Sequence, residues 1–373
     1  MTRPLRILSV IGTRPEAVKM APVVQLLAAT PGIQSFTCVT AQHREMLDQV
    51  LNLFGLSPDV DLDLMRPDQS LAQITAAIFT RLDPVLKDLQ PDWVLAQGDT
   101  TTVVATALLS YYNRIKFGHV EAGLRTGDKF QPFPEEVNRM VAAAAADLHF
   151  APTEWSKQNL LKENIPAGHI RVTGNPVIDA LQQVAGRPTP PEITHLLEPF
   201  GQARIILVTA HRRENFGKPL EDICAALEHL VRQYGDSIHI VYPVHLNPNV
   251  QNVVYPRLEK FPAHITLLPP LDYLPMVHLM KRSYLVLTDS GGLQEEAPGL
   301  GVPVLVMRAA TERPEGLAAG TVKLVGTDTG NIFATARQLL DDPREYEKMA
   351  RAVNPYGDGH ASERIVQALL DAG

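Results

Sequence analysis

Short apolar runs that alternate with helix-like segments are the feature that most constrains the fold of this chain. In the first half they lie at residues 6–13, 35–41, 92–99, 116–123 and 148–153. Helix-like segments lie between them, at residues 17–29, 43–54, 71–89, 101–112 and 135–146. Because the runs are apolar throughout, each is expected to be a strand buried on both faces, as in a parallel sheet. This order of strands and helices predicts an α/β, doubly wound sheet.

A second series of apolar runs follows in the other half of the chain. It reads as a second sheet of the same kind, with strands at 203–211, 239–245, 264–270, 284–292, 302–308 and 321–326. At 373 residues the chain exceeds the size of one ordinary hydrophobic core, so two domains are expected. We place one Rossmann-like domain at residues 1–175 and the other at 176–355. We expect the two to face a central cleft that holds the functional site.

The composition excludes several classes of partner. The formal net charge is -7, and acidic and basic residues are interleaved, so the chain offers no basic stripe for nucleic acid and no polybasic segment for a membrane surface. No apolar stretch approaches the roughly 18 residues of a membrane span. The two cysteines, Cys38 and Cys224, lie far apart in apolar stretches, as buried thiols of a reducing compartment do. We therefore expect a cytoplasmic protein.

Polar residues follow the apolar runs, at the positions where open parallel sheets bind ligands. They are Arg14, Lys19, Asp99, His119, Glu121, His211, Arg212, His245 and the segment DSGGLQEE at 289–296. In that segment Ser290, Gly291 and Gly292 predict a helix N-terminus whose N–H groups hold a diphosphate; an ordinary N-cap is the competing interpretation. Glu295 or Glu296 would then reach ribose hydroxyls. Neither a GxGxxG nor a P-loop motif follows a strand, which disfavours a nicotinamide cofactor and P-loop chemistry.

The segment HVEAGLRTGDKFQPFPEEVNRM, residues 119–140, gathers charges in irregular backbone. Pro132 and Pro134 exclude a regular helix until the second proline has passed. Phe130 and Phe133 indicate that the segment is tucked in, whereas a solvated surface loop is the competing interpretation. Irregular backbone of this kind often carries functional residues.

Three carboxylates coincide in location. Asp99, Glu121 and Glu135 all project from strand ends of the first domain, where neighbouring carboxylates perturb one another and share acid and base work. For Glu135, a capping role at a helix N-terminus is an alternative of equal weight. The coincidence favours a catalytic cluster.

Taken together, the motifs resemble one known family over nearly the whole chain. GTRPEAVKMAPV, TAQHREMLDQVL, QGDTTTVVATA, HVEAGLRTGD, PFPEEVNR, TGNPVIDAL, TAHRREN, YPVHLNP, LTDSGGLQEEAPGLGVPVLVMR, TERPE and NPYGDG resemble, in this order, segments of the bacterial non-hydrolysing UDP-N-acetylglucosamine 2-epimerases. The diphosphate turn alone is shared with two-domain glycosyltransferases of the B type. The resemblance implies a glycosyltransferase-B-like fold and interconversion of UDP-N-acetylglucosamine and UDP-N-acetylmannosamine through elimination of UDP to 2-acetamidoglucal and its re-addition.

The resemblance also implies roles for individual residues. Implied catalytic residues are Asp99, Glu121, Glu135 and His211, and the base that acts at C2 is left unassigned. Residues that resemble those holding UDP are Arg14, Lys19, His245, Ser290, Gly291, Gly292, Glu296 and Arg313. Gln42, His43 and Arg212 resemble parts of a pocket for a second, activating UDP-N-acetylglucosamine. The family uses no added cofactor or metal, its members are usually homodimers, and residues 356–373 are expected to pack back on the first domain.

Three other functions require different features. A hydrolysing epimerase, which releases N-acetylmannosamine and UDP, is disfavoured because this sequence carries no sugar-kinase domain. A B-type glycosyltransferase would share the diphosphate turn but would not need Asp99, Glu121 and Glu135 together. A catalytically silent sensor of nucleotide sugars would keep Ser290 and Glu296 and have no use for the carboxylates.

Overall fold

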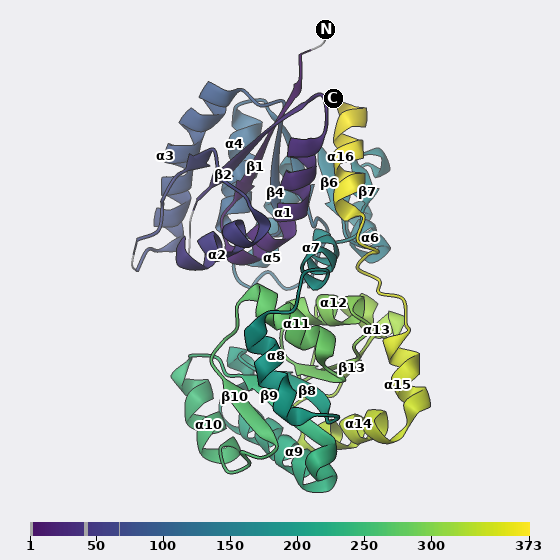
Figure 1. Ribbon diagram of the computed structural model, residues 1–373. Helices are drawn as coiled ribbons and strands as arrows, with labels where there is room; N and C mark the ends of the chain where they lie inside the picture. Colours follow the sequence, from purple (N-terminus) through teal and green to yellow (C-terminus); the bar gives the residue numbers. More distant parts are fainter. Residues whose placement is uncertain (1–2, 41–43, 67) are drawn as a thin grey trace. The chain divides into compact units, whose positions relative to one another are not determined.

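The structure, a computed structural model, describes residues 3–40, 44–66 and 68–373 and divides the chain into two compact units. Unit 1 comprises the chain up to Ala180 together with Tyr356–Gly373, and unit 2 is the continuous stretch Leu181–Pro355. The division falls inside helix α7 (Pro176–Ala185), whereas the sequence analysis set the boundary after residue 175. Each unit is a parallel sheet flanked by helices (Figure 1).

Unit 1 holds a seven-stranded sheet in the order β3-β2-β1-β4-β5-β6-β7, with every adjacent pair parallel. The strands are β1 (Leu5–Ile11), β2 (Ile33–Val39), β3 (Val60–Asp61), β4 (Trp93–Gln97), β5 (Lys116–Val120), β6 (Leu148–Ala151) and β7 (Ile170–Val172). The five strands expected in this half are confirmed. The two edge strands β3 and β7 escape prediction because so few residues leave no apolar run.

Of the helices of unit 1, those predicted between the strands begin and end close to the expected positions, whereas the helices at 154–162 and 176–185 were not predicted. The helices of this unit are α1 (Arg14–Ala29), α2 (Arg44–Phe54), α3 (Leu71–Leu89), α4 (Thr101–Tyr112), α5 (Glu135–Ala145), α6 (Glu154–Lys162), α7 and α16 (Ala361–Ala372). The C-terminal helix α16 runs beside α1 (Figure 1). Its first turn is held by Asp179 of α7, whose carboxylate accepts from the backbone N–H of Ala361 at 3.2 Å and of Ser362 at 2.8 Å.

Unit 2 holds a six-stranded parallel sheet in the order β10-β9-β8-β11-β12-β13. Its strands, all predicted, are β8 (Arg204–Thr209), β9 (Ile238–Pro243), β10 (Ile265–Leu268), β11 (Leu285–Thr288), β12 (Val304–Val306) and β13 (Val322–Leu324). Its helices are α8 (Pro191–Leu197), α9 (Lys218–Tyr234), α10 (Pro248–Leu258), α11 (Tyr273–Arg282), α12 (Gly291–Gly299), α13 (Pro314–Ala319), α14 (Thr329–Asp341) and α15 (Pro343–Ala350). Both sheets reverse their order beside the first strand, and such switch points are where open α/β sheets bind ligands.

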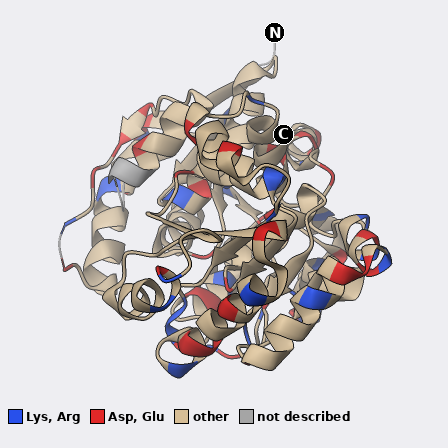
Figure 2. Ribbon diagram, turned by 60° about the horizontal axis from the view of Figure 1, so that its bottom comes forward, with Lys and Arg blue, Asp and Glu red and all other residues tan. Residues whose placement is uncertain are grey.

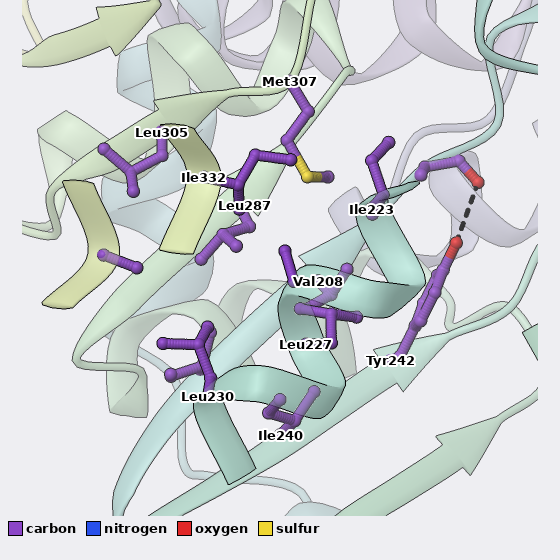
Figure 3. Close-up of a cluster of buried hydrophobic side chains, with 14 of the residues drawn as sticks. Val208, Ile223, Leu227, Leu230, Ile240, Tyr242, Leu287, Leu305, Met307 and Ile332 are labelled. Atoms are coloured by element: carbon purple, nitrogen blue, oxygen red, sulfur yellow. Dashed lines mark hydrogen bonds between the residues drawn. The ribbon is translucent and has the colours of Figure 1, made fainter. Parts of the chain in front are cut away.

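The core of unit 2 is an apolar layer between its sheet and helices α9 and α14. Figure 3 shows Leu227 of α9 and Ile332 of α14 among strand residues such as Leu287. The one hydroxyl drawn there belongs to the fully buried Tyr242, which donates to the carbonyl of Ala210 at 3.2 Å. That bond satisfies the phenol, which would otherwise be costly to bury.

Both cysteines lie in the interior, as the sequence predicts. Cys38 and Cys224 are both free and buried, and burial raises the pKa of each thiol to about 12. Acidic and basic residues are interspersed over the elements in Figure 2. Within the described ranges, no helix combines the length and the apolar character that crossing a membrane requires.

Candidate active site

Two carboxylates leave neighbouring strands of unit 1 at the same edge of the sheet. β4 and β5 pair as far as Gln97 and Val120, so the residues that follow them emerge side by side. Asp99 follows Gly98, whose φ of 88° lets the chain turn at once. Glu121 itself has a φ of 63°, a left-handed conformation that is strained for a residue with a side chain. Such strain is typical of functional positions.

Glu121 is held as an anion. Its side chain is 3% exposed, and Lys19 Nζ lies 2.7 Å from each carboxylate oxygen. Asn175 donates to Oε1 at 3.0 Å, and the Gln97 amide donates to Oε2. A cation and two amide donors favour the charged form of a buried carboxylate. Lys19, for which the resemblance implies UDP binding, thus contacts Glu121 here.

Asp99 is tied to helix α5 through Arg139. The guanidinium Nε lies 2.9 Å and Nη2 2.7 Å from Asp99 Oδ2, and the Asn138 side chain donates to the Asp99 carbonyl at 2.8 Å. Arg139 also donates through Nη1 to Glu136 at 3.0 Å. Glu136 in turn accepts from the backbone N–H groups of 126 and 127, each at 3.0 Å. The charges of the irregular segment therefore attach it to the turn that carries Asp99.

The expectation that the two phenylalanines of this segment are buried is wrong. Phe130 and Phe133 are 64% and 63% exposed. Polar contacts order the backbone in their place: besides the bonds to Glu136, the Thr126 hydroxyl donates to the carbonyl of Gln131 at 2.5 Å. Hydrogen bonds of this kind leave no apolar signature for a sequence pattern to reveal.

Glu135 stands apart from its neighbour Glu136. It is the first residue of α5, and the N-cap residue before it, Pro134, supplies no side-chain cap. The Glu135 Oε2 atom is buried and has no hydrogen-bond partner among the described residues. An unpaired buried carboxylate oxygen is costly, so a native structure that keeps one calls for an explanation. An oxygen that meets substrate is such an explanation.

His119 contacts the backbone of the turn that carries Asp99. It lies fully buried in β5, with Nε2 2.7 Å from the carbonyl oxygen of Gly98. Burial lowers its pKa to about 4, so the ring is neutral at physiological pH. In the neutral ring Nε2 donates to the carbonyl, and His119 therefore positions the turn that carries Asp99.

The turn after β1 contains a buried carboxylate that the sequence analysis did not single out. Glu16, 2% exposed, accepts from the Gly12 N–H at 2.6 Å and from the Thr13 hydroxyl at 3.0 Å. A side chain at Gly12 would place its Cβ 2.4 Å from the hydroxyl oxygen of Thr102. The N-terminus of α1 is thus closed by its own carboxyl group. Arg14, in the same turn, makes no hydrogen bond or ion pair with the described part of the chain.

The N-terminus of α12 in unit 2 is where the sequence predicts a diphosphate site. Ser290 is the N-cap residue, its side chain makes no capping bond, and two glycines follow. The Arg313 guanidinium lies on Gly291, because a Cβ built there would come within 2.6 Å of Nη1. The dipole of a helix N-terminus and a guanidinium together suit a diphosphate. The structure brings Ser290, Gly291, Gly292 and Arg313 together in one place.

The two carboxylates of α12 have different surroundings. Glu295 is 1% exposed and pairs with Arg313, which assigns it to the support of that arginine. Glu296 is 8% exposed, and its Oε1 accepts from the Tyr273 hydroxyl at 2.8 Å. Of the pair, Glu296 is therefore the better candidate for ribose hydroxyls.

Glu312 joins three arginines and was not foreseen as a site residue. Its carboxylate lies 3.2 Å from Arg212, 2.8 Å from Arg308 and 2.8 Å from Arg313. Burial by itself would raise the pKa of Glu312, but Arg313, Arg308 and Arg212 outweigh it and bring the pKa to about 2. Arg212 belongs to this network, whereas Gln42 and His43, proposed for the same effector pocket, lie outside the described residues.

Asp289 orients His211. The fully buried Asp289 lies 3.1 Å from His211 Nδ1 through Oδ1, and its Oδ2 accepts from the backbone N–H of His211 at 2.8 Å and of Arg212 at 2.9 Å. Burial opposes ionisation of Asp289, but the bonds from His211 and its neighbours leave the pKa below its usual value. In a neutral ring whose proton is on Nδ1, facing Asp289, the free nitrogen of His211 is Nε2.

His245 stacks on His211, with ring centroids 5.6 Å apart and an interplanar angle of 19°. Its Nδ1 accepts the N–H of Asn247 at 3.1 Å, which places the ring proton on Nε2. Burial and the neighbouring His211 lower the pKa of His245. His245 thus supplies an N–H donor through Nε2, and His211 Nε2 is a nitrogen that can give or take a proton. In the described ranges no group of three or more His, Cys, Asp or Glu residues is arranged to hold a metal ion.

Comparison with known proteins agrees with this arrangement. The family model described as UDP-N-acetylglucosamine 2-epimerase matches residues 25–370. The UDP-N-acetylglucosamine 2-epimerase of Salmonella typhimurium is 54% identical over 371 residues, which cover 98% of each chain. The crystal structure of the UDP-GlcNAc 2-epimerase from Neisseria meningitidis bound to UDP-GlcNAc is 50% identical, with a TM-score of 0.91, over 98% of this chain and 100% of that one.

A more distant likeness concerns the fold alone. The glycosyltransferase of kitacinnamycin is 12% identical, with a TM-score of 0.66, over 100% of this chain and 99% of that one. The expected α/β fold, with two doubly wound sheets of the glycosyltransferase-B kind, is confirmed. Since the family model spans nearly the whole chain and the Salmonella relative matches it end to end, this chain belongs to the UDP-N-acetylglucosamine 2-epimerase family.

Proposed function

We propose that this chain is a non-hydrolysing UDP-N-acetylglucosamine 2-epimerase, which interconverts UDP-N-acetylglucosamine and UDP-N-acetylmannosamine in the cytoplasm and supplies N-acetylmannosamine units for cell-surface polysaccharide. The observation that carries the proposal is the pair Asp99 and Glu121 at adjacent strand ends, each bound to a cation. Membership of the family, and a close relative bound to UDP-GlcNAc, support the same substrate.

The reaction needs acid and base groups because no carbonyl acidifies the proton on C2. Cleavage of the C1–O bond gives C1 oxocarbenium character, and carboxylates stabilise such a cation. The C2–H electron pair then forms the C1–C2 double bond, the proton passes to a carboxylate, and the C1–O pair leaves with UDP. Re-addition of UDP, with protonation of C2 on the other face, gives the epimer. Asp99, Glu121 and Glu135 are the candidates for these steps.

The leaving diphosphate needs positive charge that is already in place. The N-terminus of α12 and the Arg313 guanidinium supply it in unit 2, and the two glycines let the phosphates approach the backbone. His245 Nε2–H adds a neutral donor, and His211 can give or take a proton at the departing oxygen. Arg14 of unit 1 is a further cation for this role.

The decisive experiment follows C2 in heavy water. The protein is incubated with UDP-N-acetylglucosamine in deuterated buffer, and the sugars are analysed by NMR. Deuterium at C2 in intact nucleotide sugars of both configurations is expected. Free N-acetylmannosamine with UDP would identify a hydrolase instead, and unchanged substrate would refute epimerisation. Asp99→Asn should lower turnover by about 10²–10⁴-fold with UDP affinity retained.

We further propose that a second UDP-N-acetylglucosamine activates the enzyme through a pocket that includes Gln42, His43 and Arg212. The support in the described residues is that Arg212 is half-buried and oriented by Glu312 and by the Asp289 carbonyl, 3.1 Å from its Nε. A sigmoidal dependence of rate on substrate concentration, made hyperbolic by Arg212→Lys, is the expected result. A hyperbolic wild-type curve would remove this proposal.

We infer that the protein acts as a homodimer. At the end of α4, Tyr111 and Tyr112 are 68% and 63% exposed, and the Tyr112 ring lies 6.2 Å from that of Phe79 of α3. An exposed aromatic patch of this kind is typical of a protein interface. Sedimentation of the wild type should give a dimer, and Tyr111→Asp with Tyr112→Asp should give a monomer. A wild-type monomer would exclude the inference.

A further inference from the structure

Glu16 is a buried carboxyl group that the proposed reaction leaves without a role. It lies in the first turn of α1, at the point where the sheet order switches between β1 and β4. These two strands pair as far as Val10 and Ala96, so the turns that follow them are adjacent. One turn carries Glu16, and the other carries Asp99.

The surroundings of Glu16 can satisfy both of its protonation states. The Gly12 N–H, 2.6 Å from Oε2, requires an acceptor, and either form of the carboxyl group supplies one. The other partners are hydroxyls, those of Thr13 at 3.0 Å and of Thr100. A hydroxyl donates to a carboxylate and accepts from a carboxylic acid by rotating its proton. The site therefore holds a proton or releases it without losing a hydrogen bond.

Among the described residues no ion pair joins Glu16 to a cation, Arg14 of the same turn included. Lys19, on the same helix, is bound to Glu121, and Arg139 of α5 is bound to Asp99. His119 of β5 is neutral at physiological pH. Burial raises the pKa of Glu16 to about 7, its hydrogen bonds lower it in part, and the charge of Asp99 raises it further. The charge of Asp99 thus reaches Glu16 across the two adjacent turns.

Resting on the proposed epimerase function, we propose that Glu16 is a positioning residue for Asp99. It joins the β1–α1 turn to the β4–α4 turn through Thr100, and the proton that it holds or releases sets the charge that Asp99 experiences during turnover. When Glu16 is neutral, Asp99 is relieved of a neighbouring negative charge. When Glu16 is ionised, its negative charge lies beside the turn that carries Asp99.

The pH dependence of turnover tests this role, because a merely structural residue would not change it. The wild type should show an inflection of kcat near neutral pH, with a limb of about ten-fold per pH unit for one proton. Glu16→Gln stays neutral, keeps an acceptor for the Gly12 N–H and should lack that inflection. Asp92→Asn is the matched control, since Asp92 accepts the Arg6 N–H at 2.9 Å at the opposite end of β4. Its profile should follow the wild type.

A parallel profile for Glu16→Gln, shifted only in height, would overturn the proposal. If that variant does not fold, NMR of wild-type protein labelled at the glutamate carboxyl carbons gives the titration of Glu16 directly. Asp99→Asn should then move the titration to lower pH, and an unchanged titration would overturn the coupling. Because this measurement needs no turnover, it stands even if the heavy-water experiment rejects the epimerase function.

Discussion

At the scale of single residues, the contact between Gly291 and Arg313 is the most sensitive feature of the anion site. A Cβ at Gly291 would lie 2.6 Å from Nη1 and 2.8 Å from Cζ, so Gly291→Ala must displace the guanidinium. The displaced arginine would weaken its contacts with Glu295 and Glu312. We expect unfolding free energy to fall by about 1–3 kcal/mol and UDP affinity to drop, measured by thermal unfolding and calorimetry.

The neighbouring glycine provides the control. A Cβ at Gly292 meets nothing closer than 3.7 Å, which is ordinary contact. Gly292→Ala should therefore leave unligated stability unchanged or raise it by up to about 1 kcal/mol, because alanine favours the helix. Equal destabilisation by both substitutions would mean that the position of Arg313 does not matter.

Glu16 also makes a prediction about stability. Its pKa in the folded protein, about 7, is above the ordinary value of 4.5, so between these values the native state binds the proton that the unfolded chain has released. Stability from this group is therefore present in acid and is lost as pH rises through about 7. Relative to Glu16→Gln, the wild type should lose up to about 3 kcal/mol over that range in urea unfolding. A constant difference would contradict a raised pKa.

Some residue roles follow from sequence and others do not. Asp99 and Glu121 could be predicted because each directly follows an apolar run, and strand ends are where parallel sheets place functional groups. The partnership of Lys19 with Glu121 could not be, since the two are separated by 102 positions and meet only once the sheet forms. Glu312 shows the same limit: its three arginines identify it, and their convergence is a property of the fold.

At the scale of elements, helix α5 and the segment before it act through Arg139. This residue spans Asp99 and Glu136 with three nitrogens, which a lysine cannot reproduce. Arg139→Lys should lower turnover at least about ten-fold and unfolding free energy by about 1–3 kcal/mol, measured by steady-state kinetics and urea unfolding. Turnover at the wild-type level would show that Asp99 keeps its position without the Arg139 guanidinium.

Arg125→Lys is the matched control at this scale. Arg125 makes a similar two-point contact with Glu163, with both distances at 2.7 Å, but it does not contact Asp99. Stability should fall, and turnover should be retained. The comparison separates the loss of an ion pair from the loss of a positioned carboxylate.

Helices and strands can be predicted where they depend on a local sequence pattern. The prediction fails where a segment is held by contacts with residues distant in the sequence. The start of α5 at Glu135 follows from Pro132 and Pro134, and the buried strands follow from continuous apolar runs. The exposure of Phe130 and Phe133 cannot be predicted from the sequence, because the backbone of their segment is held by hydrogen bonds to Glu136. Apolar composition alone suggested the opposite.

At the scale of the whole molecule, one unit is continuous in sequence and the other is not. Unit 2 is the single stretch Leu181–Pro355, whereas unit 1 needs the C-terminal residues that carry α16. A chain ending at Pro355 loses the helix that packs on α1 and that Asp179 caps. Calorimetry should show a lower melting temperature for unit 1, while unit 2 keeps its transition and its UDP affinity. A single transition lowered as a whole would refute this division.

The division of the chain into two sheets was the feature most readily predicted from the sequence. Chain length and two series of apolar runs are enough for it, since they depend on burial and not on any particular contact. The position of the last helix was available only from family resemblance, because a helix of ordinary amphipathic pattern does not reveal which sheet it covers.

Asp289 connects the ring of His211 with the turn that begins helix α12. Its carboxylate binds the ring of His211, and its backbone is bonded directly to Ser290, where the anion turn begins. If a nucleotide binds at that turn, as we propose, Asp289 is the residue through which a shift of the turn would reach the imidazole. We therefore expect the position of the His211 ring to differ between the nucleotide-free and the nucleotide-bound protein.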